Sequence, residues 1–205
     1  MSTAATRIPL ADALAEAQTF RALFDGMFER WEFAGSLRRR TTDIGDIEHV
    51  AIPAVSTSPN LLNEPESEQN HSLRQRAREL LDRRHLALHD YGGSTRFGPR
   101  YMGFDYSGRT HELFVATSDN WGVILAIRTG SADFSRDLMV RLRRNGYRVS
   151  GGRLWRAVDY WIAKRQQESL LLDDETWGVP IACTDEFTLF TAAGYAAVIP
   201  PEERQ

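Results

Sequence analysis

Two acidic residues lie two positions apart in a short segment, IGDIEHVAIP, that has the apolar character of a β-strand. Because successive side chains of a strand point to opposite faces, Asp46 and Glu48 share one side of it. The other side carries Ile47, His49 and Ala51. We therefore expect one acidic and one apolar face, and we expect His49 to be a buried, hydrogen-bonded histidine rather than a ligand.

A third acid, Glu112, lies on another predicted strand well downstream. Acids on one side of a sheet repel each other and are costly to bury unless a cation compensates them. Carboxylate clusters suit Mg²⁺ or Mn²⁺. Two such ions about 3.5 to 4 Å apart can activate a hydroxyl and stabilise the leaving oxygen in phosphoryl transfer. The alternative is a solvent-facing strand that binds no metal.

A Gly-Ser pair, Gly35-Ser36, precedes the basic triplet Arg38-Arg39-Arg40. At the start of a helix, such a turn offers backbone N–H groups, a hydroxyl and a positive dipole end to a triphosphate. Arg39 can add charge-assisted hydrogen bonds. The sequence therefore places a candidate nucleotide site about ten residues before the candidate metal site.

The stretch AGSLRRRTTDIGDIEHVAIP resembles a motif of the family X DNA polymerases, to which DNA polymerase beta belongs. In that motif a G-S-x-R-R turn is followed, seven residues after its second Arg, by the first Asp of G-D-x-D. The step from Arg39 to Asp46 is the same. Four more stretches are similar to family motifs (R-I-P, K-F-M-G, R-R-V-D and the T-G-S start of the thumb) in the same order: Arg7-Ile8-Pro9, Arg100-Tyr101-Met102-Gly103, Arg109-Thr110-His111-Glu112 and WGVILAIRTGS.

The resemblance covers nearly the whole chain and implies an α+β fold. Residues 1–118 would form a nucleotidyltransferase palm, with a mixed or antiparallel sheet and helices on one face. Residues 119–205 would form a small α+β thumb. The resemblance is to minimal, viral-type members that keep only these two parts.

Site residues follow from the same resemblance. Asp46, Glu48 and Glu112 would be catalytic and would hold two metal ions, Mg²⁺ or Mn²⁺. Nucleotide binding is implied for Arg7, Gly35, Ser36, Arg39, Arg128, Thr129, Gly130, Ser131 and Ser135. DNA binding is implied for Arg100, Arg109, Arg136 and Arg144.

The implied activity is that of a gap-filling, template-directed DNA polymerase of DNA repair, which adds dNMP to a primer 3′-hydroxyl. Its partners would be gapped or primer–template DNA and a dNTP, and it would be a monomer. One alternative is nucleotidyl transfer to another acceptor, such as an untemplated 3′ end, an RNA, a protein or a small molecule. Another is a degenerate palm that binds nucleic acid without catalysis, because Glu48 and Glu112 replace family Asp residues, Thr110 replaces an Arg, and the net charge is −3.

Charge is unevenly distributed along the second half of the chain. Residues 128–165 contain ten basic and three acidic residues, whereas the following 40 contain eight acidic residues and one Arg. The basic block either grips nucleic acid or is a solvated face neutralised by its acidic neighbour. The five Trp residues could stack on bases, but we expect each to lie in the core.

Cys183 is the only cysteine, which excludes an internal disulfide and favours an intracellular, cytoplasmic protein, nucleoid-associated and viral proteins included. No stretch has the length of a signal peptide core or a membrane span. Periodicity and turn residues predict the following elements: a helix over 10–28, a short strand at 33–34, a polar loop over 56–70, a helix over 72–86, strands over 100–104 and 111–117, a helix ending at 128, a helix over 134–144, a hairpin over 146–155, and a short helix from 185.

Overall fold

The computed structural model describes residues 7–54, 68–168 and 179–205. The chain divides into two compact units, Met1–Ala116 and Thr117–Gln205. In the described residues, no helix combines the length and the apolar character needed to span a membrane.

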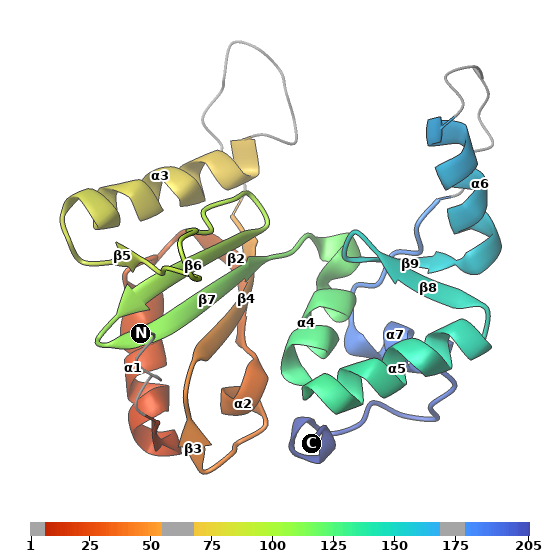
Figure 1. Cartoon of the computed structure of the whole chain (residues 1–205), viewed down its shortest axis with the longest axis horizontal. Coiled ribbons are helices and arrows are strands. Elements are labelled where there is room, and N and C mark those ends of the chain that lie inside the picture. Colours follow the sequence, from red (N-terminus) through yellow and green to blue (C-terminus); the bar gives the residue numbers. More distant parts are fainter. Residues whose placement is uncertain (1–6, 55–67, 169–178) are drawn as a thin grey trace. The chain divides into compact units, whose positions relative to one another are not determined.

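The first unit contains a five-stranded sheet with the strand order β2-β4-β7-β6-β5 (Figure 1). Its strands are β2 (Phe28–Phe33), β4 (Ile47–Pro53), β5 (Ala87–Leu88), β6 (Tyr101–Tyr106) and β7 (Arg109–Val115). β4 and β7 are parallel and the other neighbours are antiparallel, so the sheet is mixed, as predicted. A separate two-stranded sheet joins β1 (Ile8–Pro9) to β3 (Asp43–Ile44).

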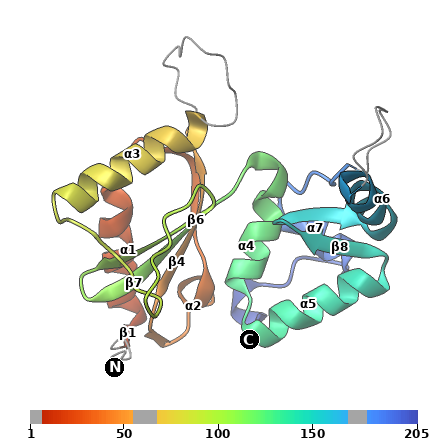
Figure 2. The same ribbon diagram turned by 45° about the horizontal axis from the view of Figure 1, so that its top comes forward.

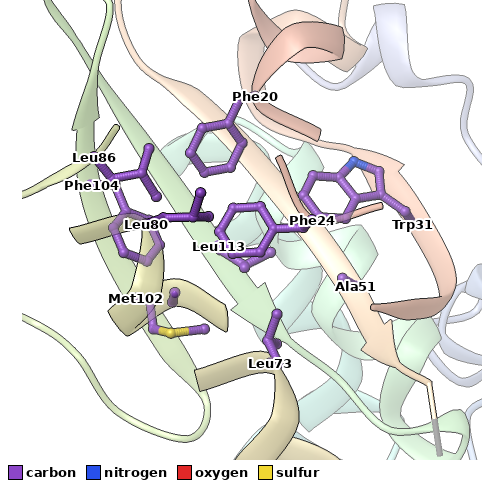
Figure 3. Close-up of a cluster of buried hydrophobic side chains, with 11 residues drawn as sticks. Phe20, Phe24, Trp31, Ala51, Leu73, Leu80, Leu86, Met102, Phe104 and Leu113 are labelled. Atoms are coloured by element: carbon purple, nitrogen blue, oxygen red, sulfur yellow. The ribbon is translucent and has the colours of Figure 1, made fainter. Parts of the chain in front are cut away.

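Helices α1 (Leu10–Ala22) and α3 (Glu68–Asp82) pack on one face of this sheet, as the predicted fold requires (Figure 2). Phe20 and Phe24 come from the α1 region, and Leu73 and Leu80 come from α3. They pack against a set of sheet residues (Figure 3): Trp31, Ala51, Met102, Phe104 and Leu113. Removing these side chains from water stabilises the unit by about 25 cal/mol per Å² of apolar surface. Because successive side chains of a strand alternate between its two faces, Glu48 of β4 and Glu112 of β7 lie on the opposite face of the sheet.

The first helix is shorter than predicted. It ends at Ala22, and residues 28–33 form β2. Gly26 adopts a left-handed φ of 75°, which favours glycine and turns the chain before the strand. Met27 and Phe28 fit the helical period, yet both pack against the core from outside the helix. The predicted loop over 56–70 lies mostly outside the described residues, and its last three residues begin α3.

The second unit contains helices α4 (Trp121–Thr129), α5 (Ala132–Arg144), α6 (Ala157–Glu168) and α7 (Glu186–Ala192), with the hairpin β8 (Tyr147–Ser150) and β9 (Arg153–Arg156). Two short 3₁₀ helices lie at Ser118–Asn120 and Pro201–Glu203. Its core gathers side chains of α4, α5, β9 and α7 around the buried, free Cys183. The hairpin was predicted, and α6 was not.

Three contacts join distant parts of this unit. Arg204 is fully buried and forms an ion pair with Glu186, whose side chain is 10% exposed. The backbone carbonyl of Arg204 also accepts a hydrogen bond from the N–H of Ser131 at 3.0 Å. Ile181 pairs with Leu154 through a backbone hydrogen bond of 2.7 Å, so the chain returns to β9 after α6.

Candidate active site

The parallel pairing of β4 and β7 places two of the three predicted acids side by side. Glu48 and Glu112 are register partners, and both side chains are half-buried. Asp46 lies two residues before Glu48 and is exposed. Backbone geometry therefore brings the three positions to one face at one end of the strand pair.

The Glu48 carboxylate rests on the backbone of Gly35. A Cβ added to Gly35 would lie 1.9 Å from Glu48 Oε2, and the φ of Gly35 is +57°. This glycine begins the short helix α2 (Gly35–Arg38), directly after β2. Both the turn and the close approach of the carboxylate require a residue without a side chain.

A pocket of about 300 Å³ lies beside these acids. It is lined by Arg7, Ser36, Arg39, Thr41, Thr42, Asp43, Gly45 and Asp46. Three residues expected to bind a triphosphate thus share one pocket with the first acid. Two guanidinium groups, a hydroxyl and an open volume suit a phosphorylated ligand.

Arg39 lies in the electrostatic field of two of the acids. Burial lowers the pKa of Arg39, and the negative charges of Glu48 and Asp46 oppose that shift. An arginine stays protonated under such conditions. The side chain therefore brings a fixed positive charge to the boundary between the pocket and the acids.

Glu112 is held by two tyrosines that were not expected at this site. The hydroxyl of Tyr91 donates to Glu112 Oε1 at 3.0 Å, and the hydroxyl of Tyr101 donates to the same oxygen. Burial raises the pKa of Tyr91 to about 12. Burial, with the bond to Glu112, also raises the pKa of Tyr101. Both hydroxyls are therefore protonated donors at neutral pH.

Gly103 makes room for this arrangement. It is the register partner of Glu112 on β6, and a Cβ there would lie 2.3 Å from the Tyr91 hydroxyl. A larger residue would expel the Tyr91 ring from its place beside the carboxylate. Tyr91 lies outside the named strands, so no sequence pattern connected it with Glu112.

The three acids fit a divalent metal in kind and in backbone placement. Carboxylate oxygens are the ligands that Mg²⁺ and Mn²⁺ prefer. However, nowhere in residues 7–54, 68–168 and 179–205 do three His, Cys, Asp or Glu side chains gather as a group that could hold a metal ion. Metal binding through Glu112 Oε1 would compete with the two tyrosine hydroxyls that donate to this oxygen.

The residues predicted to contact a nucleotide in the second unit have structural partners. Ser131 caps α5, because its hydroxyl accepts a hydrogen bond from the Phe134 N–H at 3.1 Å. The Ser135 hydroxyl donates to the Ile127 carbonyl at 3.2 Å. The remaining members of the predicted set are Arg128, which is exposed, Thr129, which is buried, and Gly130. A role for these residues in nucleotide binding stays a prediction.

Among the predicted DNA-binding arginines, Arg109 has a different position from the rest. Arg100, Arg136 and Arg144 are exposed. Arg109 is 6% exposed, and its Nε lies 3.2 Å from Glu16 Oε1. Burial and the contact with Glu16 keep this guanidinium away from solvent, and a role for Arg109 in DNA binding stays a prediction. Its alternation with His111 on β7 places it on the core face.

His49 is buried and hydrogen-bonded, as predicted. Its Nε2 lies 3.0 Å from His111 Nδ1, and His111 Nε2 lies 3.0 Å from Glu16 Oε1. Both imidazoles stack on Phe20. These residues occupy the face of the sheet opposite the acids, so they belong to the core and not to the site.

Two solved structures are similar to the chain over 97% of its length. One is Leishmania infantum polymerase beta in a ternary gap complex, with a TM-score of 0.72 and 17% identity over 71% of that chain. The other is Leishmania infantum polymerase beta in a ternary P/T complex, with a TM-score of 0.67 and 16% identity over 77% of that chain. No family model matches the chain, and no curated protein matches its sequence. The chain therefore has the α+β fold of polymerase beta.

Proposed function

We propose that the chain is a nucleotidyltransferase that acts on DNA. The observation that carries this proposal is the pocket in which Arg7, Ser36 and Arg39 lie together with Asp46. The two guanidinium groups and the hydroxyl would bind the phosphates of a dNTP. The acids would lie next to the reacting phosphate.

Asp46, Glu48 and Glu112 would hold two Mg²⁺ or Mn²⁺ ions. When bound, such ions supply positive charge that activates a primer hydroxyl and stabilises the leaving pyrophosphate. Arg39 would neutralise phosphate charge from the side of the pocket, opposite the metal ions. Glu48 would take part from its position against the backbone of Gly35.

The finer proposal is a template-directed, gap-filling DNA polymerase that works in DNA repair. Residues 1–118 would serve as the palm, and residues 119–205 as the thumb. Similarity of fold to a polymerase beta solved in gap and P/T complexes supports DNA as the partner. An inactive protein that binds nucleotide or DNA is the second candidate, and the hydrogen bonds that occupy Glu112 favour it.

Primer extension on gapped and primer–template DNA, with Mg²⁺ or Mn²⁺, tests the proposal. We expect Asp46→Ala to lower the extension rate by about 100-fold or more. The metal ions, whose positive charge stabilises the transition state, would lose one of their ligands. Asp25→Ala is the control, since Asp25 is an exposed acid that does not line the pocket. No extension by the folded wild type would contradict polymerase activity, and calorimetry of Mn²⁺–dNTP binding would then identify an inactive binder.

A further inference from the structure

The β8–β9 hairpin has two faces with different partners. Leu154 is buried in the core of the second unit, together with the neighbouring side chain of Val149. Arg148 and Trp155 are register partners, and alternation places them on the opposite face. Helix α6 packs on that second face, outside the core cluster (Figure 1).

Cations and aromatic rings join α6 to the hairpin. The guanidinium of Arg148 lies 4.3 Å from the ring centre of Tyr160 and 5.2 Å from that of Trp161. Tyr160 also contacts Trp155, with ring centres 6.0 Å apart. Lys164 Nζ lies 5.5 Å from the Trp161 ring. Each distance is within the range of cation–π or aromatic contact.

The outer side of this assembly is exposed. Trp161 is 47% exposed, although we expected it in the core, and Val158 is 62% exposed. Between Arg148 and Arg165 there are five basic residues and one acidic residue. Of the basic ones, Arg153, Arg156, Lys164 and Arg165 are exposed. A half-exposed aromatic ring thus lies beside the positive charges of Arg148 and Lys164.

We propose that this surface, which we call the Trp161 platform (Arg148, Arg153, Trp161 and Lys164), binds single-stranded nucleic acid. A base would stack on the exposed part of the Trp161 ring, and the neighbouring cations would neutralise phosphates. Single strands fit because their base faces are open, whereas a duplex hides them in the stack. The inference rests on the proposed function only in naming DNA as the strand.

An anionic membrane fits the platform less well. Helices that lie on membranes present a continuous apolar face to the lipid. On α6, the large hydrophobic residues described as exposed are Val158 and Trp161, and the Trp161 ring is flanked by cations. Local positive charge beside an aromatic ring is instead what sequence-tolerant strand binding requires.

Fluorescence anisotropy of a labelled oligothymidylate, in EDTA and without nucleotide, measures binding apart from catalysis. We expect Trp161→Ala to weaken binding about tenfold, and Trp161→Phe to keep most of it, because a ring still stacks. Phe187→Ala is the matched control: Phe187 is 56% exposed on α7. Circular dichroism checks that each variant is folded.

Wild-type binding of oligothymidylate that falls with salt and with Trp161→Ala, but not with Phe187→Ala, supports the platform. Equal affinity of wild type and Trp161→Ala overturns it. So does a Trp161-dependent preference for fully duplex DNA or for phosphatidylglycerol vesicles. Asp46→Ala should bind the oligothymidylate like the wild type, so failure of the platform and failure of the proposed function are distinguishable.

Discussion

At the scale of single residues, the hydroxyls of Tyr91 and Tyr101 decide what Glu112 can bind. Both donate to the same carboxylate oxygen, and both stay protonated at neutral pH because burial raises their pKa values. A divalent cation that binds through this oxygen, Oε1, would need the lone pairs that these hydroxyls occupy. The tyrosines and a metal bound at Oε1 would therefore compete.

Removing one hydroxyl should make metal binding tighter. We expect Tyr101→Phe to raise the affinity for Mn²⁺ about tenfold, since a hydrogen bond to a charged group is worth about 1.5 to 3 kcal/mol. Calorimetry on the nucleotide-free protein measures this change. Tyr106→Phe is the control on the same strand, because the Tyr106 ring contacts Phe20 and His111 rather than the acids. Unchanged or weaker Mn²⁺ binding by Tyr101→Phe would show that there is no competition.

Gly35 allows two effects of a side chain to be separated. Gly35→Ala and Gly26→Ala each place alanine at a left-handed φ, which costs about 1 kcal/mol of stability. Only at Gly35 would the new Cβ also meet the Glu48 carboxylate, since nothing lies within 4 Å of a Cβ at Gly26. We expect similar losses in urea unfolding, but a loss of Mn²⁺–dNTP binding in Gly35→Ala alone. Equal nucleotide binding by the two variants would argue against a role for Glu48.

Part of the candidate site could be predicted from the sequence. The Gly-Ser turn and the Asp46 to Glu48 spacing are local, and Arg7 joins them in the pocket. Tyr91 could not be foreseen, because only tertiary structure brings an irregular segment to Glu112. The burial of Arg109 could have been expected from its alternation with His111 on the same strand.

At the scale of helices and strands, periodicity predicted the elements that bury an apolar stripe. Helix α5 and the β8–β9 hairpin were anticipated because Leu138, Leu142 and Leu154 point into the core. Helix α6 was missed because it packs on the hairpin through rings and cations, and periodicity of apolar residues does not detect such contacts. The end of α1 was misplaced because Phe28 satisfies both the helical period and the strand.

The contact of α1 with β4 and β7 should make the first unit sensitive to acid. Burial lowers the pKa of His111 to about 3 and lowers the pKa of His49 as well. Within the described residues, His49 Nδ1 has no hydrogen-bond partner to share a proton with. Below pH 6.5, His49 and His111 therefore take up protons in the unfolded chain but stay neutral in the folded chain until a much lower pH.

We expect the free energy of unfolding to fall as the pH drops from about 6.5 toward 3. His111 alone accounts for a loss of about 2 kcal/mol at pH 5, at about 1.4 kcal/mol per pKa unit. Glu16, whose pKa burial raises, offsets part of this loss, and Arg109 is the other charged group that faces the pair. Urea unfolding at pH 7.5 and 5 checks the prediction. The exposed His85 gives the control, since His85→Gln should keep the wild-type dependence.

At the scale of the whole molecule, stability is divided between two units with separate cores. The buried cluster around Phe20 and that around Cys183 share no residue. A change that affects one core should therefore act first on its own unit.

The buried ion pair of the second unit tests this division. Arg204→Ala leaves Glu186 buried without its partner, and such a change costs about 3 kcal/mol or more. We expect faster hydrogen exchange at amides of α4, α5 and α7, with little change in β4 and β7. Arg141→Ala removes a solvent-exposed pair with Asp137 and should leave both units nearly unchanged. Equal acceleration in both units would mean that the chain unfolds as a single cooperative block.

The backbone bridge between Leu154 and Ile181 makes the stretch that carries α6 a separable part of the second unit. The stretch that carries α6 leaves the hairpin and rejoins it at almost the same point, so both of its ends are anchored on β9. It could be excised and replaced by a short turn, or exchanged for another peptide, while the core around Cys183 keeps its shape. At such a site, another peptide could be inserted in place of the stretch that carries α6 without changes to the rest of the second unit.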